Sequence, residues 1–429
     1  MRSNELILYR DFKHGNILGL ASVIMSGEDA DAKSHMTDFA GELVELAVSH
    51  GYSGNLWQAY LTYLIANNEN AFSTSCEMRG MPNGSIAEAA LFDLSIFREL
   101  FVMDLSEMDG ICGTDFSRML TDYTVDRDRS RLFNKRIRDS IMELRDRLAA
   151  AESDEDFTAK TAQFYKEFGV GKFGLHKAFR VEHTDAGVKI VPITNILHVQ
   201  LEDLVGYESA KKKLVDNTEA FLAGRPCNNC LLFGDAGTGK SSSIKGILNR
   251  YYDRGLRMIE IYKHQFRDLN DVIDQIKTRN YRFIIYMDDL SFEDFETDYK
   301  YLKAVIEGGL EKKPENILIY ATSNRRHIVR EKNSDKDDRD DDLHSNDTVQ
   351  EKLSLSYRFG ETIYFGRPDK KQFNEIVKAI AARSDLHMSE EELLLEANKW
   401  ELGHGGLSGR CAQQFIDHML SGGAREGGG

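Results

Sequence analysis

The strongest pattern in this 429-residue chain is the glycine-rich segment GDAGTGKS, which runs from Gly234 to Ser241. It fits the pattern G-x-x-x-x-G-K-[ST] at each fixed position, follows a short apolar run and precedes a helical stretch. Such a loop needs glycine because its backbone must curl until the N–H groups face phosphate oxygens. The segment therefore predicts a phosphate-binding loop, with Lys240 beside the β- and γ-phosphates and the Ser241 hydroxyl on Mg²⁺.

The patterning on either side of this loop predicts an α/β fold in several parts. From 196 to 367, short apolar runs alternate with helical stretches, which is typical of a parallel sheet covered by helices. Residues 1–195 show helical periodicity and end in a segment that predicts a hairpin. We therefore expect a mainly helical N-terminal domain with a terminal hairpin over 1–195, a nucleotide-binding core over 196–367, a helical lid over 368–421 and a flexible tail over 422–429.

Charge and cysteine content limit the environment and the partners. The net charge of −15 opposes non-specific binding of nucleic acid or of an anionic membrane surface. Residues 1–195 carry −9 of this charge, and an acidic insert at 331–352 carries −5. With 5 scattered cysteines, and neither a signal peptide nor an apolar run long enough to span a bilayer, we expect a cytoplasmic protein that does not enter the membrane. A basic cluster precedes the insert and is expected to pair with its carboxylates, with nucleic acid or an acidic group of a partner as the alternatives: Arg325, Arg326, His327 and Arg330.

Two carboxylates follow the apolar run FIIYM at 283–287. At the end of a buried strand downstream of a phosphate loop, Asp288 is placed to bind Mg²⁺, and Asp289 to orient or deprotonate the attacking water. Glu293 lies a few residues further on and is a second candidate for that role. The sequence leaves the choice between Asp289 and Glu293 open.

Three more polar side chains have types and positions suited to phosphate chemistry. Asn324 ends the apolar run ILIYATSN, so its amide can reach a γ-phosphate or a water from the neighbouring strand. Arg358, in SLSYRFG, has the permanently charged planar guanidinium that suits a transferring phosphoryl group, although a structural salt bridge is the alternative. Arg410 follows Ser408 in the first turn of the last helix, from which it can reach the nucleotide.

Taken together, these residues resemble the AAA+ ATPases over about 196 to 420. The segment DLVGYESAKKKL, with Val205 and Gly206, is similar to the segment that lines the adenine pocket in that superfamily. The other matches are Walker A (Gly234, Asp235, Ala236, Gly237, Thr238, Gly239, Lys240, Ser241 and Ser242), Walker B (Asp288 and Asp289), sensor 1 (Asn324), the arginine finger (Arg358) and sensor 2 (Arg410). The runs NNCLLFGDAGTGKSS, IYATSNRRH and EKLSLSYRFG more closely resemble a bacterial AAA+ family that is still catalogued as a domain of unknown function.

This resemblance implies a five-stranded parallel sheet of the P-loop NTPase type, a helical lid, and ATP with Mg²⁺ between them. It also implies a homo-oligomer, either a ring or an open hexamer, because an arginine finger normally acts on the ATP of the adjacent subunit. It leaves the macromolecular partner unknown, whether protein or nucleic acid. Two functions remain: an ATP hydrolase that remodels or loads that partner, and an ATP-gated binding or assembly switch with little turnover.

Departures from the superfamily pattern separate these possibilities. Asp289 stands where the motor ATPases usually have Glu, which favours slow hydrolysis or the switch. The segment KHQFR lacks the aromatic-hydrophobic-glycine loop that threads polypeptide, so an unfoldase is disfavoured and depends on Phe266 alone. Cys227 and Cys230 have zinc-like spacing, but without a second pair we expect packed thiols. Nothing resembles an acceptor site, which disfavours a small-molecule kinase.

Overall fold

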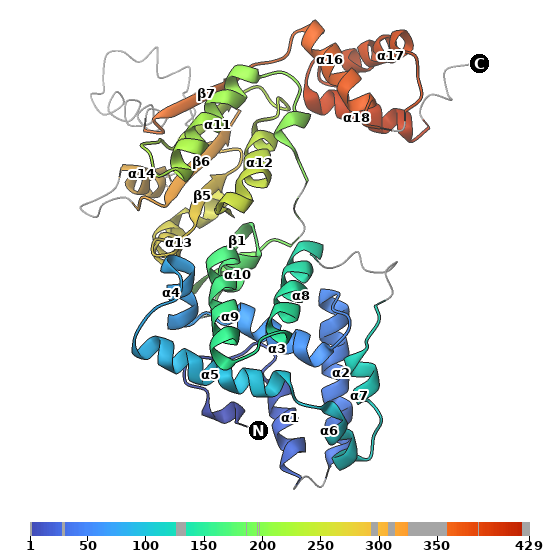
Figure 1. Ribbon diagram of the computed structural model, residues 1–429. Coiled ribbons are helices and arrows are strands. Elements are labelled where there is room, and N and C mark those ends of the chain that lie inside the picture. The colour runs from blue at the N-terminus through green and yellow to red at the C-terminus, as the bar shows by residue number, and fades with distance from the viewer. Residues whose placement is uncertain are drawn as a thin grey trace. The chain divides into compact units, whose positions relative to one another are not determined.

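The protein is described by a computed structural model, and its contacts divide the chain into two compact units, Met1–His176 and Lys177–Gly429. The residues described are 2–27, 31–125, 134–185, 187–194, 196, 198–292, 299–307, 314–324, 358–384 and 386–422. Each unit has its own hydrophobic core, and each is described by itself below (Figure 1).

The first unit is mainly helical in its described residues, as the periodicity predicts. Its elements are η1 (Ser3–Glu5), α1 (Asn16–Ser26), α2 (Ala32–His50), α3 (Leu56–Asn67), α4 (Ala71–Arg79), α5 (Ser85–Phe101), α6 (Leu105–Cys112), α7 (Ser117–Thr121), α8 (Lys135–Ala149), α9 (Asp154–Phe168) and α10 (Gly171–Leu175). The helix α3 is buried on nearly every side because its residues are apolar all round, which makes it the central helix of the core. Trp57, in its first turn, donates its indole N–H to the Leu100 carbonyl at 2.7 Å and so ties α3 to α5.

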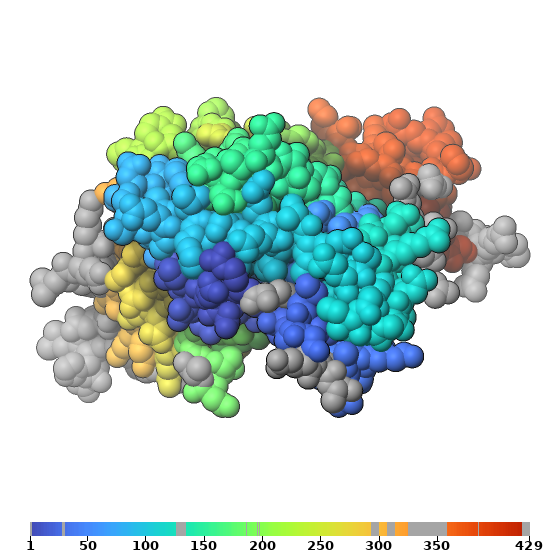
Figure 2. All heavy atoms as spheres, turned by 60° about the horizontal axis from the view of Figure 1, so that its bottom comes forward, coloured from blue at the N-terminus to red at the C-terminus, as the bar shows by residue number. Residues whose placement is uncertain are grey.

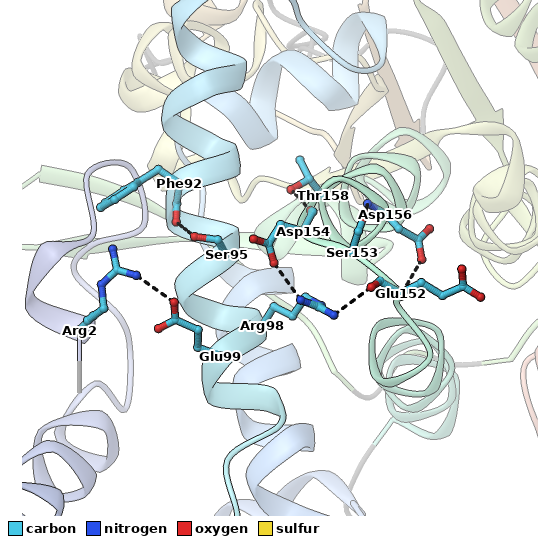
Figure 3. Close-up of polar contacts among 10 residues, drawn as sticks. All are labelled: Arg2, Phe92, Ser95, Arg98, Glu99, Glu152, Ser153, Asp154, Asp156 and Thr158. Carbon is cyan, nitrogen blue, oxygen red and sulfur yellow. Dashed lines mark hydrogen bonds and ion pairs between the residues drawn. The ribbon is translucent and has the colours of Figure 1, made fainter.

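Ion pairs and a hydrogen bond join α5 to the N-terminal segment and to the start of α9 (Figure 3). Arg98 pairs with Asp154 at 3.1 Å and donates to the Glu152 carbonyl at 3.0 Å, which joins α5 to the start of α9. Arg2 pairs with Glu99 at 2.9 Å, so the N-terminal segment also lies on α5. Figure 2 shows this dark blue segment against the lighter blue residues of α5.

The second unit is built on a seven-stranded sheet with the order β2-β1-β4-β5-β6-β3-β7. The five strands β4, β5, β6, β3 and β7 are mutually parallel, which confirms the predicted five-stranded parallel core. The strands are β1 (Ala178–Thr184), β2 (Gly187–Pro192), β3 (Cys230–Gly234), β4 (Leu256–Glu260), β5 (Arg282–Met287), β6 (Ile317–Ser323) and β7 (Glu361–Phe365). The central strands are buried on both faces, because helices cover the sheet on both sides.

The hairpin β1–β2 corrects the predicted domain boundary. We expected it to close the N-terminal domain at 195, but β1 pairs in parallel with β4, with Arg180 opposite Glu260. The hairpin therefore extends the sheet of the second unit, and the chain divides after His176. Ala178 of β1 belongs to the hydrophobic core of the second unit, which explains why the hairpin joins this unit.

Helices complete the second unit. They are η2 (Leu201–Asp203), α11 (Glu208–Leu222), α12 (Lys240–Tyr251), η3 (Tyr252–Arg254), η4 (Lys263–Asp268), α13 (Leu269–Ile276), α14 (Tyr299–Glu307), α16 (Lys370–Ala381), α17 (Glu390–Gly403) and α18 (Gly409–Leu420). The helices α11 and α12 pack on one face of the sheet, whereas α16, α17 and α18 form a separate small core, the predicted lid. Ser389 and Ser408 cap α17 and α18 with their hydroxyls, which fixes where the lid helices begin.

Candidate nucleotide-binding site

The phosphate loop links β3 to α12, as the sequence predicts, and its glycines are needed for two different reasons. Gly234 has φ +135°, and a Cβ there would lie 2.0 Å from the Phe365 carbonyl oxygen of the adjacent strand. Gly237 and Gly239 have φ +74° and +92°, in the left-handed region that other residues avoid. Glycine is therefore required at position 234 because the adjacent strand packs closely against it. It is required at positions 237 and 239 because the backbone there has a positive φ.

Lys240 begins α12 and is only 6% exposed. Its ammonium group donates to the carbonyl oxygens of Gly234 at 2.9 Å and Asp235 at 2.6 Å, and to Oδ1 of Asn324 at 3.1 Å. Burial lowers the pKa of Lys240, while the carboxylates around the loop act in the opposite direction. The lysine is thus held among oxygen atoms that phosphate oxygens can replace.

Asp288 lies directly after β5 and accepts two hydroxyl hydrogen bonds on the same oxygen. The Ser241 hydroxyl donates to its Oδ1 at 2.7 Å, and the Thr322 hydroxyl donates to that oxygen at 2.6 Å. Burial by itself would raise the pKa of Asp288, but the hydrogen bonds from Thr322 and Ser241 outweigh it, so the pKa is lowered. Asp288 is therefore a carboxylate at neutral pH, next to the serine of the phosphate loop.

Asp289 has an unusual backbone conformation, with φ +50°. Its N–H donates to the Thr322 hydroxyl at 2.9 Å, and its Oδ1 accepts from the Asn324 amide at 2.7 Å. A left-handed conformation costs a non-glycine residue about 1–2 kcal/mol, and such strain concentrates at functional sites. In this backbone conformation the carboxylate of Asp289 faces Asn324, which directly follows the neighbouring strand β6.

These contacts form one continuous network. It passes from Lys240 through Asn324, Asp289 and Thr322 to Asp288, and returns to the loop at Ser241. It exists because β5 and β6 are adjacent and parallel, with Met287 opposite Ala321, so their carboxyl ends meet beside the loop. The predicted Walker A, Walker B and sensor 1 residues are thus brought to one place.

A cavity of about 730 Å³ opens beside this network. That volume is in the range of small-molecule and cofactor sites. The cavity is lined by residues of the phosphate loop, the carboxyl ends of β5 and β6, the segment before α11 and the lid. The predicted residues Val205, Asn324 and Arg410 line it, together with Ala236 to Ser242, Asp288 and Asp289.

The lid is bonded directly to the phosphate loop. The N–H of Arg410, in the first turn of α18, donates to the Gly237 carbonyl at 3.3 Å. The N–H of Arg367, between β7 and the lid, donates to Oδ2 of Asp235 at 3.0 Å. The loop is therefore bonded to the lid through Gly237 and to the segment that leads into the lid through Asp235.

Some predicted residues lie outside the cavity lining. Gly234 and Asp235 begin the loop, and their carbonyl oxygens accept from Lys240. Gly206 packs against Gln372, whose Nε2 would lie 2.1 Å from a Cβ at position 206. Arg358 precedes β7, whose other end pairs with Gly234, so it lies at the opposite end of the sheet from the phosphate loop. Glu293, the basic cluster at 325–330 and the acidic insert at 331–352 lie outside the described residues.

Other site residues are absent from the sequence prediction. Thr322 connects both Walker B carboxylates, yet only strand adjacency reveals this role. The apolar end of the cavity is completed by Ile376 and Ile380 of α16, and by His198 and Leu204 before α11. The amphipathic pattern of 370–381 indicated a buried face but could not show that part of it faces a cavity.

The donors around Ser241 fit a magnesium ion. Mg²⁺ prefers hard oxygen ligands, takes few of them from protein, and is usually bound with substrate phosphates. The Ser241 hydroxyl and the Asp288 carboxylate supply such oxygens at the mouth of the phosphate loop, 2.7 Å apart. These two residues would hold the ion.

The structure also decides two alternatives raised by the sequence. Phe266 is 2% exposed and packs against Phe292, with ring centroids 5.9 Å apart, so it is not available to grip a polypeptide. Cys230 is buried in β3, and burial raises the pKa of its thiol. Within the described ranges, no group of three or more His, Cys, Asp or Glu side chains could hold a metal ion.

Comparison with known proteins identifies the family. A family model described as "Protein of unknown function (DUF815)" matches residues 174–423, more than half of the chain. The chain belongs to this family. It is a bacterial, AAA+ ATPase-related family, and the match begins just before β1, so it includes the hairpin that extends the sheet.

Other matches are more distant. The large subunit of replication factor C from Staphylothermus marinus is 35% identical over 80 residues, which are 18% of this chain and 18% of that protein. The Thermotoga maritima RuvB Holliday junction branch migration motor is 16% identical, with a TM-score of 0.38, over 52% of this chain and 64% of that chain. A proline-to-glycine mutant of the same RuvB is 17% identical, with a TM-score of 0.38, over 52% and 65%. This chain thus spans less than two thirds of each of these proteins.

One finding bears on membrane insertion. None of the helices in the described part of the chain has both the length and the apolar character needed to cross a bilayer.

Proposed function

We propose that this protein binds ATP with Mg²⁺ and hydrolyses it as an oligomer, using the cycle to remodel or load a macromolecular partner. The observation that carries the proposal is the hydrogen-bonded network from Lys240 to Ser241 at the mouth of a cavity of about 730 Å³. Each member has a group suited to one part of a nucleoside triphosphate, and the cavity continues from this polar end to an apolar end.

Each residue of the site has a separate role in the proposed binding and hydrolysis of ATP. The loop N–H groups and Lys240 bind the phosphates, while Val205 and Ile376 line the end that accepts the base. Bound Mg²⁺ neutralises charge on the β- and γ-phosphates. Asp289 accepts a proton from the attacking water or orients it, and Asn324 holds Asp289 in place at 2.7 Å. Arg410 brings a further positive charge from the lid.

Arg358 completes the site of a neighbouring subunit in this proposal. The five residues of β7 rise about 3.3 Å each, so Arg358 is roughly 15 Å from its own phosphate loop. A guanidinium at that distance stabilises no charge on its own nucleotide. In a ring or open hexamer it can face the next cavity, where arginine fingers raise turnover by about 10³–10⁵.

Mixing two inactive variants tests this arrangement. Lys240→Ala removes a subunit's own phosphate site but leaves Arg358, and Arg358→Ala does the reverse. We expect each variant alone to have lost ATP hydrolysis, and a mixture to recover part of the wild-type rate. No recovery in a mixture that assembles by mass photometry, or full activity of Arg358→Ala alone, contradicts the proposal.

A second function is favoured by one observation. The strained Asp289 is an aspartate whose carboxylate is already bonded to Asn324, an arrangement that suits an ATP-gated assembly switch with little turnover. Steady-state hydrolysis separates the two functions. A wild-type rate no higher than that of Asp289→Asn or Lys240→Ala, together with ATP-dependent assembly, favours the switch.

A further inference from the structure

An arginine at the apolar end of the cavity takes no part in the proposed hydrolysis. Arg383 follows α16, and its N–H donates to the Ile380 carbonyl at 3.1 Å, so it continues the last turn of that helix. It lies three residues after Ile380 and seven after Ile376, a spacing that places the three side chains on one face. All three line the cavity.

The guanidinium of Arg383 joins the lid to the opposite wall of the cavity. Its Nη1 pairs with Oδ1 of Asp203 at 2.8 Å, and its Nη2 donates to the Asp203 carbonyl at 2.9 Å. Its Nε donates to the Ala379 carbonyl at 2.9 Å, which fixes the guanidinium against α16. Several charge-assisted hydrogen bonds from one planar guanidinium define its geometry closely. The pair of Arg383 and Asp203 thus connects the two walls at a defined place.

Asp203 belongs to a segment that is itself held on the core of the second unit. It ends η2, whose first residue, Leu201, is 3% exposed and belongs to the core beneath the sheet. Two residues before η2, the Val199 carbonyl accepts from the side-chain amide of Asn249 in α12 at 2.8 Å. The residue that receives the arginine is therefore fixed to the helix that begins at the phosphate loop.

The lid is bonded to the core at both ends of the cavity. At the phosphate end, the bond runs from the Arg410 N–H to the Gly237 carbonyl. At the apolar end, it is the pair of Arg383 and Asp203. Between these ends lie apolar side chains of α16 and of the segment before α11. Walls that are held in place bind a ligand more tightly, because ordering them during binding costs free energy.

We infer that Arg383 is a positioning residue for the base of the nucleotide: through Asp203 it holds α16 opposite the segment before α11, so that the base binds between preformed apolar walls. The inference rests on the proposed function, because it requires a nucleoside triphosphate in this cavity. It gives Arg383 an effect at the base and none at the phosphates. It also makes Asp203 favourable for binding, although a negative charge by itself repels an anionic ligand.

Alanine variants of the full-length protein test this inference. Arg383→Ala and Asp203→Ala each remove one side of the pair, and the double variant removes both. Lys378→Ala is the matched control, because Lys378 is a cation of the same helix whose ion pair with Glu390 stays within the lid. Titration calorimetry with a non-hydrolysable ATP analogue measures the whole site, and titration with tripolyphosphate measures its phosphate end alone.

We expect Arg383→Ala and Asp203→Ala each to weaken analogue binding about two- to fivefold, the contribution of an exposed ion pair. The double variant should lose no more than one single variant, because both residues act through the same pair. Tripolyphosphate affinity should stay at the wild-type value in all variants. Lys378→Ala should bind the analogue as the wild type does.

Several results overturn the inference. Wild-type or tighter analogue binding by Asp203→Ala would show that Arg383 acts on the charge of the ligand and not through the pair. Losses that add in the double variant, or an equal loss of tripolyphosphate affinity, would show the same. An equal loss in Lys378→Ala would show a general effect of lid charge. If the wild-type protein binds neither ligand, the proposed function fails as well, whereas the other outcomes leave wild-type binding intact.

Discussion

The two units of this protein both hold carboxylates with several hydrogen bonds, but the donors differ. In the N-terminal unit, Asp93 accepts from three successive backbone N–H groups, those of Ile7, Leu8 and Tyr9, at 2.7–3.0 Å. In the second unit, Asp288 accepts from side-chain hydroxyls, and Asp289 from a side-chain amide. Backbone donors belong to the fold and cannot leave without unfolding it. Side-chain donors can rotate toward a ligand, so this second kind of carboxylate marks a site.

Asp289→Asn should have the largest effect, and it should appear in activity alone. In the proposed function Asp289 acts on the attacking water, and loss of such a group lowers turnover by about 10²–10⁴, while asparagine keeps an oxygen for Asn324 and tolerates the left-handed backbone. Steady-state ATP hydrolysis and the thermal unfolding midpoint, measured on the same preparation, check this. A large fall in the unfolding midpoint would show that Asp289 stabilises the fold, as Asp93 does, and would contradict the difference proposed between the two units.

Asp93→Asn should have the opposite profile. Asparagine keeps only one acceptor oxygen for three backbone N–H groups, so we expect unfolding free energy to fall by about 3 kcal/mol, with ATP affinity unchanged. Denaturant unfolding can be followed by the fluorescence of Trp57 in a Trp400→Phe background, because these are the chain's 2 tryptophans. Glu99→Gln is the matched control, since its exposed ion pair with Arg2 contributes under about 1 kcal/mol. Equal losses in the two variants would contradict the prediction.

Asp109 gives the N-terminal unit a predictable acid sensitivity. Burial by itself would raise the pKa of Asp109, but hydrogen bonds from Ser117, Thr114 and Phe116 outweigh it and lower the pKa from 3.8 to about 2. A lowered carboxyl pKa stabilises the folded state above pH 4, and this stabilisation is lost as pH falls toward 2. Asp109→Asn should therefore remove about 2 kcal/mol at pH 5 and much less near pH 2. A loss that does not change with pH would show that the charge of Asp109 is not what stabilises the unit.

Alanine substitutions at two glycines, one in each unit, should have the smallest effect. They compare a glycine in open space with one that contacts the lid. Gly113 and Gly237 have φ +64° and +74°, so alanine costs about 1 kcal/mol of strain at either position. A Cβ at Gly113 meets no heavy atom of the described residues within 4 Å, but one at Gly237 lies 3.0 Å from the Arg410 Cβ. Only Gly237→Ala should weaken ATP binding, measured by titration calorimetry. Equal affinities of the two variants would show that the contact between loop and lid does not matter for binding.

The predictable part of this molecule is the part that depends on local spacing. The phosphate loop, the strand before it and the helix after it are contiguous in the chain, so the pattern of Gly234 to Ser241 suffices to place them. The lid helices are similar, because capping residues such as Ser389 and an apolar face are short-range signals. The positions of Asp288 and Asn324 directly after β5 and β6 also followed from the apolar runs that precede them.

The place of the hairpin in the sheet and the role of Thr322 could not be predicted from local sequence patterns. The hairpin itself was predicted, but its place in the sheet depends on pairing between Arg180 and Glu260, 80 residues apart in the chain. Thr322 was not predicted, because its value lies in standing beside Asp288 and Asp289 on an adjacent strand. Neither the pairing of β1 with β4 nor the contacts of Thr322 can be predicted from the spacing of residues along the chain.

The sequence by itself thus predicted a phosphate-binding loop and the strand and helix on either side of it, because conformation and charge in such a loop are properties of neighbouring residues. Only the tertiary structure decided which side chains join that loop into a network, and which buried polar atoms are left without partners. Tyr320 illustrates the difference, since it stands in an apolar strand run and only the surrounding side chains show that its hydroxyl bonds with Thr218 and Asn217. Hydrogen-bond partners come from elements far apart in the chain, and folding alone brings them together.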